Sequence, residues 1–172
     1  MRWTDESLTE YARTVIPSRF KEVRAELVPF SDFKVNWQKG YSWITFWVSD
    51  YLDEAPKYVM GDILLAAATE QGRESYSEQT KRWLLTRIRD KALGRYAERH
   101  GMHAGEHIDL GAFEAGGTAV MFGPLTTRDA GFSLLLDVIV INEEYDEPGR
   151  EQEIAELISG QMQELGEARE IF

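Results

Sequence analysis

All three histidines of the chain lie within one short segment, together with a glutamate. They are His100, His103 and His107, with Glu106 beside the last of them. Imidazole and carboxylate groups are ligands that Zn²⁺ or Ni²⁺ accepts, and a zinc-bound water can serve a hydrolase. Two interspersed glycines disfavour a helix that would place these side chains on one face. A solvated loop is the simpler interpretation, and a metal-dependent hydrolase that uses this cluster is the alternative.

The chain lacks the residues that most other catalytic sites need. It contains no cysteine, which excludes a thiol nucleophile, a disulfide scaffold and a cysteine-type zinc site. No serine stands in a Gly-x-Ser-x-Gly elbow, and the glycine-rich segment 111–117 does not have the pattern of a phosphate-binding loop. Acidic pairs beside prolines, at 53–54 and 146–147, are explained by helix capping and solubility rather than by acid–base catalysis.

The net charge of −11 is unevenly distributed. Eight Lys or Arg residues against four acids lie between residues 71 and 100, whereas ten acids against two arginines lie between 142 and 172. Two solvated helix faces that attract each other explain this pattern most simply. Alternatively, the basic helix binds an acidic partner or a nucleic acid through Arg87, Arg89 and Arg95. The overall charge makes general nucleic-acid binding the less favoured of these, because phosphates would be repelled.

Three tryptophans, Trp37, Trp43 and Trp47, lie close together in sequence. Their spacing places them on more than one face of the strands that carry them. We expect the core to take most of them, with an aromatic groove for a partner or ligand as the alternative.

The strands that hold these side chains are predicted from alternation and from β-branched residues. Residues 33–38 alternate, and the aromatic run at 41–48 follows a Lys-Gly turn, so an antiparallel hairpin is expected there. A short strand is expected at 118–122. The apolar run 132–141 predicts one strand covered on both faces, in which Asp137 needs a partner if it is buried.

Helices are predicted from caps and from apolar stripes. Thr4 is a plausible N-cap for a helix that ends at Pro17, or restarts there as a second short helix through Val23. Another follows Pro56 and ends at a glycine. Ser75 and the glutamate three residues later have the form of a capping box, which opens a long helix to about residue 100.

Two parts of the chain share one layout. Residues 48–56 and 140–148 each read as the end of a strand, a polar turn, Asp-Glu, a proline and then a helix. Common turn chemistry can produce such a pattern by chance. If the echo is real, the chain is a pseudo-duplicated α+β protein whose helices lie on one sheet built from both halves.

This layout resembles the minimal zinc-peptidase fold (minigluzincin or SprT-like) and archaeal proteins that carry two such modules in tandem. The similarity is carried by residues 33–37, 43–51 with Pro56, and 138–142 with Pro148, and covers about two thirds of the chain. The family binds zinc through His-Glu-x-x-His on the helix after that proline. Two histidines one turn apart hold the metal, and the glutamate acts as the base.

The chain departs from the family at this motif. The corresponding positions are occupied by Gln161, Met162 and Leu165 in the second half, and by Thr69, Glu70 and Arg73 in the first. Neither helix contains a histidine, so a shift of register does not restore the motif. The resemblance implies the fold, and the residues argue against the activity.

These observations predict a single α+β domain of 172 residues, mainly antiparallel, with halves of roughly 1–100 and 101–172. We expect a non-catalytic binding or scaffolding protein that needs no cofactor, zinc included. We expect it to bind an unidentified protein partner or to self-associate. No apolar run approaches the length of a membrane span and the first residues lack a signal-peptide pattern, so a cytoplasmic location is expected.

Overall fold

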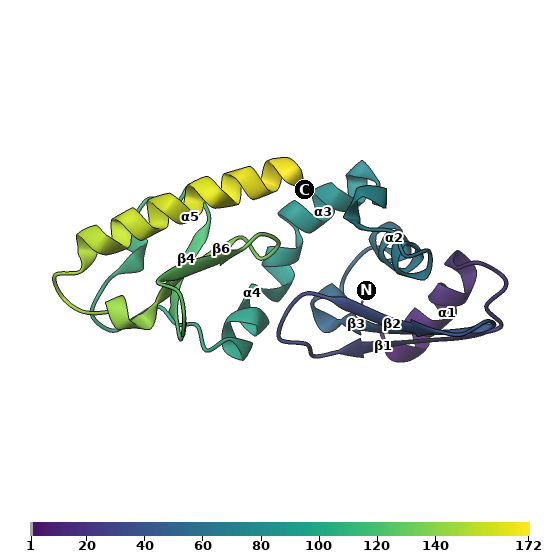
Figure 1. The fold of residues 1–172 in the computed structure, drawn as a ribbon. Helices are drawn as coiled ribbons and strands as arrows, with labels where there is room; N and C mark the ends of the chain where they lie inside the picture. Colours follow the sequence, from purple (N-terminus) through teal and green to yellow (C-terminus); the bar gives the residue numbers. More distant parts are fainter. Residues whose placement is uncertain (1) are drawn as a thin grey trace. The chain divides into compact units, whose positions relative to one another are not determined.

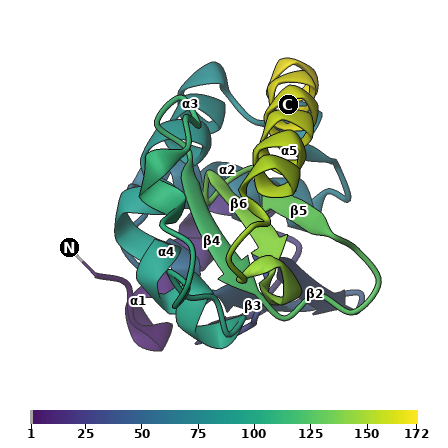
Figure 2. The same cartoon turned by 90° about the vertical axis from the view of Figure 1, so that its left-hand side faces the viewer.

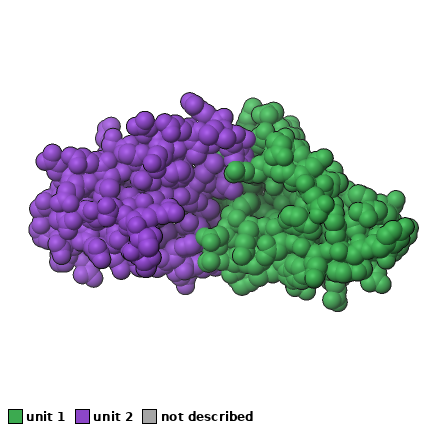
Figure 3. Space-filling model, in the orientation of Figure 1, with its two compact units in different colours: residues 1–91 green, residues 92–172 purple. Residues whose placement is uncertain are grey.

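Each half of the chain folds around its own three-stranded mixed sheet. The structure is a computed structural model that describes residues 2–172. It divides into two compact units, residues 1–91 and 92–172 (Figure 3). The α+β class is confirmed, whereas the single sheet expected from both halves is wrong. The boundary between the units falls inside helix α4 (Ile88–Arg99).

The first unit packs two helices against its sheet (Figure 1). Its elements are α1 (Asp5–Val15), β1 (Glu22–Val28), β2 (Val35–Lys39), β3 (Trp43–Ser49), α2 (Lys57–Ala68) and α3 (Glu78–Thr86). Strand β3 is central, parallel to β1 and antiparallel to β2. Alternation puts Val23, Ile44 and Phe46 on one buried face. Helix α1 packs on β1, and α2 on β2 and α1.

The second unit repeats this sheet. Its strands are β4 (Ala119–Gly123), β5 (Ala130–Ser133) and β6 (Val138–Asn142), and its long helix is α5 (Glu151–Ile171). Strand β6 is central, parallel to β4 and antiparallel to β5, and α5 packs against β5 and β6 (Figure 2). Phe122, Ile139, Ile141, Ile154 and Ile158 are among the buried residues of its core.

The two sheets agree residue by residue at their carboxyl ends. Val28 pairs with Ser49 in the first sheet, and Gly123 pairs with Asn142 in the second. A proline follows both Val28 and Gly123, and in each case the next N–H donates back to the last carbonyl of the strand. Segments of equal length then lead to Val35 and to its counterpart in β5. The echo in the sequence therefore corresponds to a repeated strand pattern.

The hairpin in the second unit corrects a sequence prediction. Residues 132–141 do not form one strand, because residues 134–137 make the turn between β5 and β6. Asp137 has φ of 50°, a left-handed conformation that suits a turn. Its carboxylate accepts hydrogen bonds from the Thr118 hydroxyl and from Arg169, so the partner expected for Asp137 is present.

Three other boundaries differ from the sequence predictions. Val23 lies in β1 and not in a second short helix. The expected long helix is two helices, α3 and α4, separated at Arg87. Thr86 Oγ1 donates to the carbonyl of Arg82, a bond of the kind that bends helices. The N-cap of α3 is Ser77, whose hydroxyl accepts the N–H of Thr80, and not Ser75.

Within residues 2–172, no helix combines the length and the apolar character that a membrane span requires.

Candidate functional site

In the second unit, two of the positions that were matched from the sequence to the zinc-peptidase motif contribute to packing. Leu165 has 2% of its surface exposed, and the half-buried Met162 packs against the core of α5 and its sheet. Gln161 is half-buried beside them. A leucine side chain has no donor atom for zinc, and a methionine thioether cannot act as a general base, so this turn of α5 serves as a packing surface.

In the first unit, the corresponding positions lie beyond the end of the helix. Helix α2 ends at Ala68, before the glycine at which the sequence predicted its end. Thr69 is its C-cap, and its hydroxyl donates to the carbonyl of Leu65 at 2.7 Å. Glu70 is left-handed, with φ of 55°, and its carboxylate lies 3.6 Å from Lys39 Nζ. Arg73 starts a short 3₁₀ segment, so these three residues do not share a helical face.

The histidines of the 100–107 segment have different neighbours. The ring of His100 stacks on Tyr96 with 4.2 Å between the ring centroids. His103 Nε2 lies 2.9 Å from Glu143 Oε2, and His107 is exposed. Among the side chains of residues 2–172, no group of three or more His, Asp or Glu is arranged to hold a metal ion.

The loop that carries these histidines is fixed by Asp146. Its carboxylate accepts the N–H groups of Glu106, His107 and Ile108 at 2.7, 3.0 and 3.0 Å. Partial burial opposes ionisation, but the three N–H donors outweigh it and lower the pKa of Asp146. The Glu106 side chain was a candidate metal ligand in the sequence. In the structure, the main-chain N–H of Glu106 helps to anchor the loop.

The basic positions of the helical region fall on both sides of the helix break. Arg87 is the C-cap of α3, and Arg89 and Arg95 belong to α4. Their role in binding an acidic partner stays a prediction.

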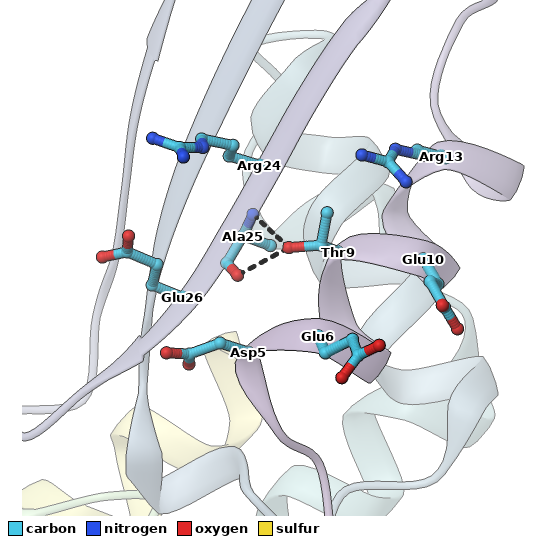
Figure 4. Close-up of a pocket in the computed structure, with 8 residues that line it drawn as sticks. All are labelled: Asp5, Glu6, Thr9, Glu10, Arg13, Arg24, Ala25 and Glu26. Carbon is cyan, nitrogen blue, oxygen red and sulfur yellow. Dashed lines mark hydrogen bonds between the residues drawn. The ribbon is translucent and has the colours of Figure 1, made fainter.

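A cleft in the first unit is lined by residues of α1 and of the outer edge of β1 (Figure 4). Thr9 Oγ1 accepts the N–H of Ala25 and donates to its carbonyl, at 3.0 and 2.9 Å. Asp5 Oδ1 accepts the N–H of Leu27 one turn earlier along α1. These two side chains satisfy part of an edge strand that would otherwise be open to pairing. The cleft has a volume of about 360 Å³.

Charge is segregated along this cleft. The side chains of Arg13 and Arg24 lie on one side of the Thr9–Ala25 hydrogen bonds in Figure 4, and those of Asp5 and Glu6 lie on the other. The arginine end continues into a second and larger depression.

We call this depression the basic hollow. Its volume is about 520 Å³. The residues that line it include Arg13, Lys21, Glu22, Arg24, Trp43 and Thr45. Within residues 2–172, no carboxylate lies within 4.0 Å of the charged groups of Arg13, Lys21 or Arg24. Three cations with one acid among them create a positive field that favours an anion.

Sequence reasoning did not identify the basic hollow. The expectation that the core takes most of Trp37, Trp43 and Trp47 is wrong, because Trp37 and Trp43 are exposed and Trp47 is half-buried. The aromatic groove was the alternative for these residues, but the three cations come from α1, from the connection after it and from β1. Only the packing of α1 beside β1 brings them together. Their alternation with acids along the chain had concealed them.

A smaller cavity of about 190 Å³ lies in the second unit. Tyr96, His100, Met102 and Phe132 contribute to its largely apolar wall, and Arg128 lies at its margin. The Asn142 amide donates to the carbonyls of Leu125 and Arg128, which fixes the loop that forms another wall.

Comparison of the chain with protein-family models, with curated proteins and with solved structures gives no match.

Proposed function

We propose that this chain is a non-catalytic binding protein, built on a tandem scaffold related to the minimal zinc-peptidase fold. The observation that carries the proposal is the burial of Leu165 and the packing of Met162 against the core of α5, where a peptidase of that family holds its metal. The repeated sheet with a helix after its central strand supports the tandem scaffold.

The binding part of the proposal is supported by the basic hollow. The chain has a net charge of −11, yet three cations with no carboxylate within 4.0 Å of their charged groups line a depression in the first unit. Like charges held close together repel each other unless a counter-charge joins them. A bound anion would therefore stabilise this surface, and no reaction is needed for that role.

Metal content tests the non-catalytic part. Untagged protein is purified without chelators, equilibrated with excess Zn²⁺, desalted and analysed for zinc per chain. We expect substoichiometric zinc in the wild type. Two variants assign any zinc that is found: Gln161→Ala on α5, and the triple variant His100→Ala/His103→Ala/His107→Ala, with the exposed Ser159→Ala as the matched control.

Stoichiometric zinc that is lost in Gln161→Ala contradicts the proposal, because a peptidase-like site would then exist on α5. Stoichiometric zinc that is lost only in the triple variant favours the alternative, a metal-dependent hydrolase using the histidine segment. Peptide hydrolysis measured with the same samples shows whether any bound zinc is active.

A further inference from the structure

We propose that the basic hollow is a binding site for a small organic anion with a planar ring, such as an aromatic phosphate. The inference deepens the proposed binding function and rests on it. It is argued from four features of the hollow: its charge, its aromatic wall, its neutral hydrogen-bonding groups and its size.

Charge selects the sign of the ligand. Arg13, Lys21 and Arg24 are exposed, and Glu22 is the one acid among the lining residues described. Arg13 belongs to α1 and Arg24 to β1, so the two guanidinium groups that line the hollow come from different elements (Figure 4). Guanidinium groups bind phosphate and carboxylate oxygens through paired N–H donors.

The indole of Trp43 supplies an aromatic wall. It is 37% exposed, so part of the ring is open to a ligand. A Cβ atom at Gly40 would lie 2.1 Å from Trp43 Nε1, which shows that the ring lies directly over this glycine. The glycine thus makes room for the indole at the hairpin. An aromatic ring seated against the backbone in this way can stack on a planar ligand with its open part.

Neutral groups complete the site. The Thr45 side chain lines the hollow beside Trp43. The N–H and carbonyl of Ala25 point outward to Thr9, and strand geometry directs the same groups of Val23 to the same edge. Main-chain N–H groups at an open edge are donors for anionic oxygens.

Size argues against an inorganic ion as the sole occupant. A volume of about 520 Å³ falls within the range of about 300–1,000 Å³ typical of sites for small organic molecules. A nucleic-acid strand or a long acidic peptide would extend beyond the hollow onto a chain whose net charge is −11, where repulsion opposes it. We therefore favour a single small molecule.

The test is calorimetric titration of the full chain at low ionic strength with adenosine 5′-monophosphate, inorganic phosphate and adenosine. We expect the monophosphate to bind more tightly than either fragment. Arg24→Gln and Arg13→Gln should each lower the affinity for the monophosphate by about tenfold or more, because each variant removes a charged hydrogen bond. Arg19→Gln is the matched control, because Arg19 lies over the Phe20 ring, 4.3 Å from its centroid, outside the hollow.

Trp43→Leu distinguishes the contribution of ring stacking from the contribution of charge to ligand binding. This variant should lower the affinity for the monophosphate by about tenfold, because stacking is lost, and should leave the affinity for inorganic phosphate unchanged. Circular dichroism on every variant checks the fold, and Lys21→Gln replaces any variant that fails to fold. All these positions are exposed.

Three results would overturn the inference: no saturable binding of the monophosphate at millimolar concentration, equal affinity for phosphate and monophosphate, or binding that Arg13→Gln and Arg24→Gln leave unchanged. Tighter binding of an oligonucleotide or of a poly-glutamate peptide would also contradict a small-molecule site. None of these results depends on zinc content, so the failure of this inference can be told apart from the failure of the non-catalytic proposal.

Discussion

Ser49 and Asn142 are equivalent residues in the two repeats. Each ends the central strand of its sheet, with φ and ψ of −54° and 132° for Ser49 and of −55° and 127° for Asn142. Each side chain accepts the N–H of the residue two positions further on, at 3.3 Å for Ser49 and 3.1 Å for Asn142. The two side chains differ in the hydrogen bonds that they make to the preceding loop. The Asn142 amide also donates to the carbonyls of Leu125 and Arg128 in that loop.

This difference predicts unequal costs for truncation. Asn142→Ala should lower the free energy of unfolding of the second unit by about 3 kcal/mol, because three hydrogen bonds are lost, two of them to the part-buried carbonyls of Leu125 and Arg128. Ser49→Ala should cost the first unit about 1 kcal/mol, since one long hydrogen bond is lost. Hydrogen exchange of amides in each unit, measured in increasing urea, reads the two effects separately. Equal losses would contradict the role assigned to the Asn142 amide.

Asp146 predicts a pH dependence of the second unit. Its pKa is lowered in the folded protein by three N–H donors against the effect of burial. A lowered folded pKa contributes stability above the unfolded pKa, and that stability is lost as pH falls through the folded value. Asp146→Asn keeps an acceptor for two of the N–H groups but turns an amide donor towards the third. We expect it to cost about 1–2 kcal/mol at pH 7.

The same variant should cost less stability at pH 3 than at pH 7, because pH 3 lies below the ordinary aspartate pKa of about 3.9, where the stability that a carboxylate of lowered pKa contributes is being lost. Urea unfolding at both values measures this. Glu144→Gln is the control, since it removes a charge from the same turn without touching the loop at 106–108. A pH-independent cost of Asp146→Asn would show that its charge is not involved.

Local signals predicted most of the first unit. The alternation at Val35 and Trp37, the aromatic run of β3 and the cap at Thr4 each describe an element that depends on near neighbours. The same alternation is present in β1, but the charged residues Glu22, Arg24 and Glu26 that alternate with Val23 and Ala25 obscured it. One face of that strand is buried and the other is exposed.

The hairpin at 134–137 could not be predicted from local signals. Three leucines occupy the turn, and no glycine, proline or asparagine marks it. The left-handed Asp137 is stabilised by Arg169, which lies near the far end of α5 and far along the chain. The basic hollow was missed for the same reason, because its cations come together only when α1 packs beside β1.

Shortening the side chains at residues 161–165, one turn of α5, tests whether these residues stabilise the core or serve a functional site. Leu165→Ala should destabilise the second unit by about 2–5 kcal/mol, as expected for a buried leucine, and Gln161→Ala should have little effect. Met162→Ala should fall between them, since Met162 is half-buried. Thermal unfolding measures the order. A stability that rises when Leu165 is shortened would instead favour a functional role for this surface, because active sites commonly sacrifice stability.

Gly40 and Trp43 should be energetically coupled. A Cβ at Gly40 meets the indole of Trp43 at 2.1 Å, so Gly40→Ala must displace the ring. We expect a loss of about 1–3 kcal/mol, the usual cost of overpacking, and weaker binding of the monophosphate than in wild type. Trp43→Leu removes the obstacle, so adding Gly40→Ala to that variant should cost little. Gly40 does not have a positive φ, and alanine can adopt its backbone conformation.

A double-mutant cycle measures this coupling directly. The free energies of unfolding of wild type, both single variants and the double variant are obtained from urea titrations of the first unit's amides. The double variant should be more stable than the sum of the single effects predicts, by most of the cost of Gly40→Ala. Additive effects would mean that the indole does not depend on the space at Gly40. The aromatic wall of the basic hollow would then lack the fixed position on which ring stacking depends.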